Sequence, residues 1–194
     1  PTMAVIALKC PHINVTVVDA NPAKVKAWNG PLDNLPVYEP GLAELVKVVR
    51  GTNLFFSDDI AGNIDKADII LLGISRSGKT PTCLYLALQY GIYAANFPLT
   101  DEELENGAIP ESLNPHRKKL FGLTISADRL RQIRKERRAI GNYASIKQIS
   151  YEIREAEKLY VKNSIKFVDT SELSIEEISG KILEQTGVQR RFRP

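Results

Sequence analysis

The sequence has few of the residues that mark secreted, metal-binding or membrane-spanning proteins. Its 194 residues include two cysteines, Cys10 and Cys83, which lie far apart and lack the spacing of metal ligands. This pattern argues against a disulfide framework or a zinc site and predicts two reduced thiols. No apolar run approaches the roughly 20 residues that cross a bilayer, and the first residues lack the pattern of a secretory signal. We therefore expect a cytoplasmic protein without a membrane segment.

The composition fits a globular protein whose charge changes sign along the chain. Hydrophobic residues make up 43% and charged residues 25%, enough for one large or two small domains. Residues 1–69 carry six basic and eight acidic side chains, whereas residues 70–194 carry 20 and 15. The basic excess is densest in residues 127–138 and includes Arg134, Arg137 and Arg138.

This basic segment has three interpretations. Its six cations stand at helical spacings that cannot place all of them on one face, which favours a solvated helix. A surface for phosphate or an acidic partner is the second, in which Arg134, Arg137 and Arg138 contact a phosphorylated partner protein. Nucleic acid is the weakest, because no aromatic residues interleave with the cations.

Strand and helix patterns alternate along the chain. A continuous apolar run at residues 65–74 is typical of a parallel strand covered on both faces, and a helix pattern follows at residues 79–91. The order predicts a layered α/β fold with a mainly parallel sheet flanked by helices, in which all the strands join one sheet. The remaining predicted strands are 13–20, 53–57, 94–99, 119–126 and 165–170, and the remaining helices are 21–29, 39–51, 110–118, 127–138, 143–162 and 174–186. Asn21 is the predicted cap of the helix at residues 21–29, and Leu84, Ala87 and Leu88 are expected to face the core from the helix at residues 79–91.

A phosphate-binding motif lies between the apolar strand and the next helix. Gly73, Gly78, Lys79 and Thr80 spell G-x-x-x-x-G-K-T. Backbone N–H groups of such a loop surround a phosphate at a helix N-terminus, the lysine neutralises it, and the threonine hydroxyl holds Mg²⁺. We expect the Lys79 amine to face solvent in the empty loop. The predicted nucleotide-binding residues are Gly73, Ile74, Ser75, Arg76, Ser77, Gly78, Lys79 and Thr80.

Asp169 is the candidate for the second group that such sites use. A carboxylate at the end of a nearby strand positions the metal or its water, and Asp169 ends the predicted strand at residues 165–170. Thr80 and Asp169 are thus the predicted Mg²⁺ ligands, and Lys79 and Asp169 the predicted catalytic residues. The alternative for Asp169 is a turn or cap residue before the helix at residues 174–186.

Four long motifs in the second part of the chain carry a resemblance. From about residue 67 to 190 the sequence resembles the bacterial regulatory proteins of phosphoenolpyruvate synthase and pyruvate, phosphate dikinase, through "ADIILLGISRSGKTPTCLYLALQYG", "KLFGLTISADRLRQIRKERR", "YASIKQISYEIREAEKLY" and "VDTSELSIEEISGKIL". The resemblance implies an ADP-dependent Ser/Thr kinase that also removes the phosphate with inorganic phosphate. It further implies ADP or ATP with Mg²⁺, and one of those two enzymes as protein substrate.

The first 66 residues resemble a different family. "VTVVD", "AWN", "YEPGL" and "NLFFS" are similar to the start of UDP-glucose 6-dehydrogenase, whose NAD-binding domain would use Asp19 for the ribose. The glycine turn that binds the dinucleotide in that family is absent from these residues. We therefore interpret the chain as a chimera of a partial Rossmann-like segment, residues 1–66, and a P-loop kinase-like domain, residues 67–194. A non-catalytic nucleotide-binding module and residual NAD binding are the alternatives to a phosphotransferase.

Overall fold

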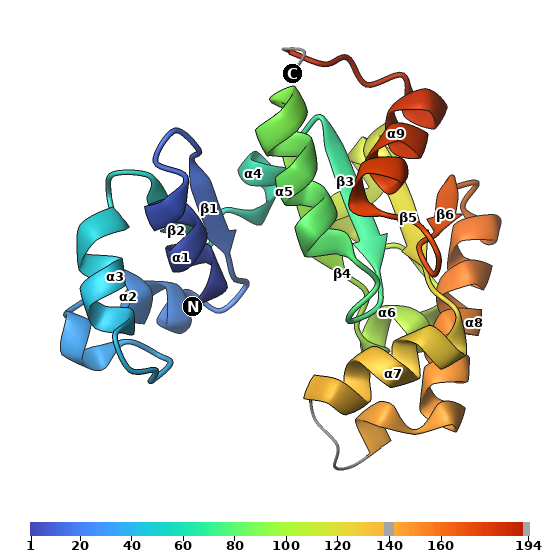
Figure 1. Cartoon of the computed structure of the whole chain (residues 1–194), viewed down its shortest axis with the longest axis horizontal. Coiled ribbons are helices and arrows are strands. Elements are labelled where there is room, and N and C mark those ends of the chain that lie inside the picture. Colours follow the sequence, from blue (N-terminus) through green and yellow to red (C-terminus); the bar gives the residue numbers. More distant parts are fainter. Residues whose placement is uncertain (138–141, 192–194) are drawn as a thin grey trace. The chain divides into compact units, whose positions relative to one another are not determined.

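The protein is described here by a computed structural model that covers residues 1–137 and 142–191 (Figure 1). The chain divides into two compact units, Pro1–Asp65 and Lys66–Pro194. Each unit has a hydrophobic core of its own. The boundary lies one residue from the predicted one, just before the apolar strand.

The first unit is a small parallel sheet of two strands with helices around it. Its elements are α1 (Thr2–Lys9), β1 (Val15–Val18), α2 (Pro22–Asn29), η1 (Leu32–Asn34), α3 (Leu42–Val49), β2 (Leu54–Ser57) and α4 (Ile60–Lys66), which runs to the boundary. Val15 pairs with Leu54. Leu54 is fully buried in the core, and the rings of Trp28 and Phe56 stack with their centroids 4.8 Å apart. Asn21 caps α2 as the sequence predicts, whereas α1 was not predicted.

The second unit carries the phosphate motif on a four-stranded sheet. Its elements are β3 (Ile69–Gly73), α5 (Lys79–Tyr90), β4 (Ala94–Pro98), α6 (Asp101–Asn106), η2 (Glu111–Lys119), β5 (Leu120–Thr124), α7 (Ala127–Arg137), η3 (Asn142–Ala144), α8 (Ile146–Lys162), β6 (Phe167–Asp169) and α9 (Ile175–Thr186). The strand order is β4-β3-β5-β6 and every pair is parallel. All five residues of β3 are buried, as the apolar run predicts. The predicted layered α/β class is confirmed.

Helices cover both faces of this sheet. Phe121 and Leu123 of β5 pack in one core with residues of α5 and α9. Successive strand residues point to opposite faces, so Gly122 lies on the other face, where a Cβ atom would come within 2.8 Å of the Tyr160 ring of α8. Helix α8 in turn packs against α6 and α7. The sheet is therefore a central layer, with its strand ends free to carry a site.

The prediction of one shared sheet is wrong. The strands of the described residues form two sheets, β1-β2 and β4-β3-β5-β6. The reason is that β4 and β5 pair with the two edges of β3, which leaves no edge of β3 for a strand of the first unit. A second correction concerns residues 111–119, which form the 3₁₀ element η2 rather than an α-helix and contain Pro115.

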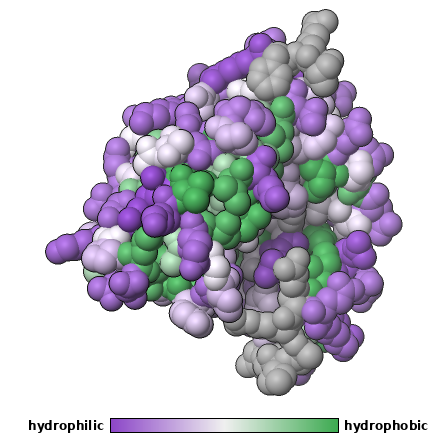
Figure 2. Space-filling view, turned by 60° about the vertical axis from the view of Figure 1, so that its left-hand side comes forward, coloured by the Kyte–Doolittle hydropathy of each residue, from purple (hydrophilic) through white to green (hydrophobic). Residues whose placement is uncertain are grey.

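The surface is mixed, with apolar side chains among charged ones. Figure 2 shows hydrophobic patches between hydrophilic side chains. In the first unit Tyr38 is 92% exposed, and Val48 and Phe55 are exposed as well. Exposed apolar side chains are ordinary on protein surfaces. Across the parts of the chain that the structure describes, we find no helix with the length and apolar character needed to span a bilayer.

Candidate nucleotide-phosphate site

The backbone of residues 73–80 has the tight shape that a phosphate loop requires. Gly73 ends β3, and a Cβ atom there would lie 2.5 Å from Ser77 Oγ and 2.9 Å from the Leu123 carbonyl oxygen. Gly78 precedes α5 with a φ of 91°, a conformation that favours glycine. Arg76 also has a positive φ, 73°, which is uncommon for a residue with a side chain. Both glycines of the motif are thus needed by the loop itself.

The Lys79 side chain is folded into the loop. Its Nζ donates hydrogen bonds to the carbonyl oxygens of Gly73 at 2.7 Å and Ile74 at 2.8 Å, and the residue is 7% exposed. The expectation of a solvent-facing amine is therefore wrong, because two backbone carbonyls capture it. The pKa of Lys79 is lowered to about 8, mainly by burial; Cys83 opposes this shift and the nearby Arg134 charge adds to it.

Cys83 lies one turn further along α5, within electrostatic reach of Lys79. Burial raises the pKa of its thiol to about 12, although the positive Lys79 opposes the shift. A thiol with such a pKa stays protonated near neutrality. Both Cys83 and Cys10 are free cysteines, as the sequence predicts.

The loop offers several polar groups to an anion. The first turn of α5 has no side-chain cap from any described residue, so its N–H groups are open to a ligand at the positive end of the helix dipole. Ser77 is fully buried, and its hydroxyl has no hydrogen-bond partner within residues 1–137 and 142–191. An unpartnered buried hydroxyl beside open N–H groups fits a phosphate. The geometry of the loop therefore supports phosphate binding independently of the sequence motif.

Thr80 lies in the first turn of α5, whereas Asp169 lies at the end of strand β6. Asn96 of β4 donates through Nδ2 to Thr80 Oγ1 at 2.9 Å, which fixes the hydroxyl. Asp169 ends β6, which β5 separates from β3, and its Oδ1 accepts the Ser171 N–H at 2.8 Å in a turn. Its neighbour Thr170 reaches the loop, with Oγ1 3.3 Å from the Ser77 carbonyl oxygen. The turn that the sequence offered as an alternative is thus present at Asp169.

The described residues contain no ready-made cage for a metal. No three His, Cys, Asp or Glu side chains gather at a point in the part of the chain that the structure covers. Mg²⁺ in nucleotide sites takes one or two side chains together with phosphate oxygens, so Thr80 with one carboxylate is a sufficient donor set. Thr80 with Asp169 or Glu157 supplies donor atoms of these kinds.

Glu157 of α8 is a carboxylate that the sequence reasoning missed. Its Oε1 accepts a hydrogen bond from Thr124 Oγ1 at 2.6 Å, at the end of β5 next to β3. The residue lies more than 70 positions after the motif, within an amphipathic helix pattern. Only the fold brings it to this edge of the sheet.

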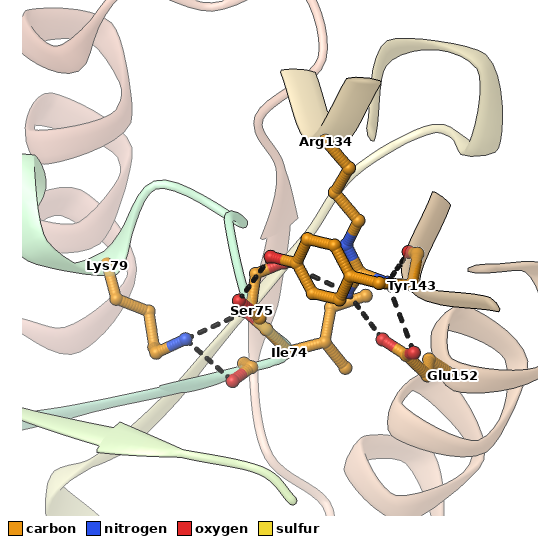
Figure 3. A network of polar contacts seen from close by, with 7 residues as sticks. Ile74, Ser75, Lys79, Arg134, Tyr143 and Glu152 are labelled. Carbon is orange, nitrogen blue, oxygen red and sulfur yellow. Dashed lines mark hydrogen bonds and ion pairs between the residues drawn. The ribbon is translucent and has the colours of Figure 1, made fainter. Parts of the chain in front are cut away.

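Arg134 of α7 was also misread from the sequence. It is 1% exposed and forms an ion pair with Glu152 of α8, so the prediction that it contacts a partner protein is wrong (Figure 3). Its guanidinium donates to the carbonyl oxygens of Ser75 and Tyr143, at 3.1 Å and 3.0 Å. The sequence pattern alone does not distinguish this buried arginine from the exposed cations around it in α7. Arg138 lies outside the described residues.

Two families of known proteins match different parts of the chain. The sequence pattern of the kinase/pyrophosphorylase family matches residues 57–183. The NAD-binding domain of the UDP-glucose/GDP-mannose dehydrogenase family matches residues 1–87, so the two matches overlap across the phosphate loop. The chimeric character inferred from the sequence is confirmed.

Curated relatives come from several bacteria and carry the provisional name phosphoenolpyruvate synthase regulatory protein. The protein of Ectopseudomonas mendocina is 55% identical over 129 residues, which are 66% of this chain and 47% of the relative. The protein of Alteromonas mediterranea is 54% identical over 147 residues, 74% of this chain and 54% of the relative. The chain spans about half the length of these relatives. With the family pattern matched across most of its second unit and the phosphate loop formed, the chain belongs to the kinase/pyrophosphorylase family.

Proposed function

We propose that residues 73–80 bind the phosphates of ADP or ATP with Mg²⁺, and that the chain is a phosphotransferase acting on a Ser/Thr hydroxyl. The observation that carries the proposal is Lys79, which the loop holds inside its own backbone between two carbonyl oxygens. Both groups that hold this cation are neutral carbonyls, so neither supplies an opposite charge. A phosphate would supply that charge at the end of α5.

Each loop residue then has a role that follows from its contacts. Lys79 would exchange its two carbonyl partners for phosphate oxygens, and Gly78 lets the backbone turn toward them. Thr80, fixed by Asn96, would hold Mg²⁺ through its hydroxyl. When bound, Mg²⁺ neutralises charge on the phosphate oxygens during transfer. Ser75 and Arg76 would line the phosphates with their N–H groups, and Ser77 with its hydroxyl, which is unpartnered within the described residues.

Asp169 is the proposed catalytic and metal-binding carboxylate, and Glu157 is the alternative candidate for this role. Asp169 is exposed at the end of β6, next to the residue that touches the loop, whereas Glu157 is half-buried beside Thr124. Asp169→Asn and Glu157→Gln form a matched pair that removes one charge each. We expect Asp169→Asn to lower the phosphotransfer rate about 100-fold or more, since a metal or base ligand is lost, and Glu157→Gln to lower it less.

The names of the relatives suggest the protein substrate. They are called regulatory proteins of phosphoenolpyruvate synthase, so we propose that enzyme, or the related pyruvate, phosphate dikinase, as the target in the cytoplasm. Residues 1–87 of this chain match a second family, the UDP-glucose/GDP-mannose dehydrogenases. The second candidate function is therefore a nucleotide-binding module without catalytic activity. Such a module would bind ADP or ATP but transfer no phosphate, unlike the proposed enzyme.

The test compares three ligands on the full chain by thermal unfolding. ADP or ATP with Mg²⁺ at about 100 times its Kd should raise the free energy of unfolding by about 2.7 kcal/mol, whereas NAD should give no shift. Asp19, the residue expected for NAD, instead accepts the Asn21 N–H at 2.9 Å. Transfer of labelled phosphate to phosphoenolpyruvate synthase then separates the enzyme from the binding module. A shift with NAD alone would contradict the proposal.

A further inference from the structure

A buried network of polar side chains joins α7 and α8 to the phosphate loop. Arg134 contributes both terminal nitrogens, which donate to the two carboxylate oxygens of Glu152 at 3.1 Å and 2.5 Å. The same nitrogens donate to the carbonyl oxygens of Tyr143 and Ser75. The guanidinium also lies over the Tyr143 ring, 4.4 Å from its centroid. Four acceptors and a ring therefore fix one side chain.

The loop end of this network is the peptide between Ser75 and Arg76. Its carbonyl oxygen accepts from Arg134 at 3.1 Å, and the Ser75 hydroxyl shares a hydrogen bond of 2.9 Å with the Tyr143 hydroxyl. In a trans peptide the C=O and N–H groups point in opposite directions. Holding the oxygen toward Arg134 thus turns the Arg76 N–H away from it. Figure 3 shows that Lys79 approaches residues 74 and 75 from a different side than Arg134.

The conformation that results is not one that Arg76 adopts by itself. Its φ of 73° lies in the left-handed region, which is unfavourable for a residue with a Cβ atom and persists only where the surroundings impose it. The fixed neighbours are Ser75, through Arg134 and Tyr143, and Ser77, through Thr170. The carbonyls on both sides of Arg76 are therefore held from elsewhere in the fold.

We propose that the Arg134–Glu152 pair is a positioning device that sets the Ser75–Arg76 peptide so that the Arg76 N–H donates to a nucleotide phosphate. The inference rests on the proposed function of the loop. Arg134 itself does not touch the nucleotide, because both of its terminal nitrogens are engaged by the four protein oxygens and the residue is 1% exposed. Glu152 keeps the buried guanidinium charge paired and its plane fixed.

The main test variant removes the whole pair. Arg134→Met with Glu152→Leu leaves no unpaired buried charge, so the full chain is expected to stay folded. ADP with Mg²⁺ is titrated at 15 °C, and amide chemical shifts are recorded on ¹⁵N-labelled protein. We expect Kd to rise about tenfold and the ADP-induced shift of the Arg76 amide to fall by more than half. A merely structural role would lower thermal stability without changing the affinity of the folded protein.

Two further variants keep the inference testable. Arg134→Lys retains the charge but cannot reach four acceptors with one nitrogen, so its Kd should rise by an intermediate factor of about three. Glu155→Gln removes a carboxylate whose partners, Arg154 and Lys158, lie on the exposed side of the same helix, and it should leave Kd unchanged. The arginine variants are compared with it as the matched control.

The outcomes separate this inference from the proposed function. Wild-type binding with weakened binding in both arginine variants supports the positioning role. Wild-type binding with equal Kd and an equal Arg76 amide shift in either folded variant overturns the positioning role alone. A wild-type protein that binds neither ADP nor ATP overturns the proposed function, and the positioning role with it.

Discussion

The direction of the Lys79 side chain is set by neighbouring backbone groups. The sequence identifies it as the phosphate ligand, yet the structure finds it folded onto the carbonyls of Gly73 and Ile74. A motif fixes residue type and spacing, whereas the direction of a long side chain depends on which acceptors the folded loop presents. Burial among these groups, rather than the motif, lowers its pKa to about 8.

Nucleotide affinity should depend on the protonation of Lys79. In the protein without nucleotide, the Lys79 amine has a pKa of about 8. A bound phosphate would raise this pKa, so nucleotide binding above pH 8 is accompanied by uptake of a proton. The Kd for ADP should be lowest below pH 8 and rise by up to about tenfold per pH unit above it. Calorimetry from pH 7 to 9.5 measures this. In Lys79→Arg, whose side chain stays charged, Kd should not rise above pH 8. The same rise of Kd in that variant would show that another group causes the pH dependence.

The free energy of unfolding should also depend on pH through Lys79. Lys79 has a folded pKa of about 8 against an ordinary value of 10.5, so the unfolded chain binds more protons between these values and the free energy of unfolding rises with pH. Cys83 acts oppositely between 9.0 and about 12, where the folded state retains the proton. A net rise of about 1 kcal/mol is expected only from pH 8 to 9. Urea unfolding of Lys79→Met should show no rise there, and Cys83→Ala should extend it.

At the scale of elements, β5 is the strand around which the second unit packs. Gly122 lies on the side of α8, where a Cβ atom would meet the Tyr160 ring and Phe167 Cβ at 2.8 Å. Tyr160 is fully buried and its hydroxyl donates to the carbonyl oxygens of Leu72 and Leu123, at 3.2 Å and 3.3 Å. The ring thus needs the space that glycine leaves.

Gly122→Ala should destabilise the protein through this contact. An added methyl group forces the Tyr160 ring and β6 to shift, at a cost of about 1–3 kcal/mol. Gly180→Ala is the matched control, because a Cβ atom there meets nothing within 4 Å and alanine favours the helix by about 0.5–1 kcal/mol. Chemical unfolding of both variants measures the difference. Equal stability of the two would show that the sheet yields at no cost.

Periodicity predicted the strands and most helices because one apolar face or run marks each of them. The buried run of β3 and the Asn21 cap of α2 are local signals and were read correctly. The face of α5 was not: Thr82, Leu86 and Tyr90 are buried rather than Leu84 and Leu88. The pairs Arg134–Glu152 and Thr124–Glu157 join distant segments, so no local pattern contains them.

At the scale of the whole chain, the two units have separate cores, and every residue of the proposed site lies in the second. Leu54→Ala, in the core of the first unit, should lower the stability of that unit by about 2–5 kcal/mol, since the side chain is fully buried. ADP affinity should remain unchanged, because no proposed ligand lies before residue 73. Circular dichroism and calorimetry on the same sample measure both quantities. A parallel loss of affinity would show that the site depends on the first unit.

The central claim is that the loop at residues 73–80 binds a nucleotide through its phosphates, and calorimetric titration of ADP with Mg²⁺ tests it most directly. Wild-type protein and Lys79→Met are compared at pH 7.5, where the wild-type amine is mainly charged. Methionine fills the buried space without charge, so the fold should be kept while Kd rises about 100-fold, from loss of a charge-assisted contact. Equal affinity in the folded variant, or no binding by the wild type, would contradict the account.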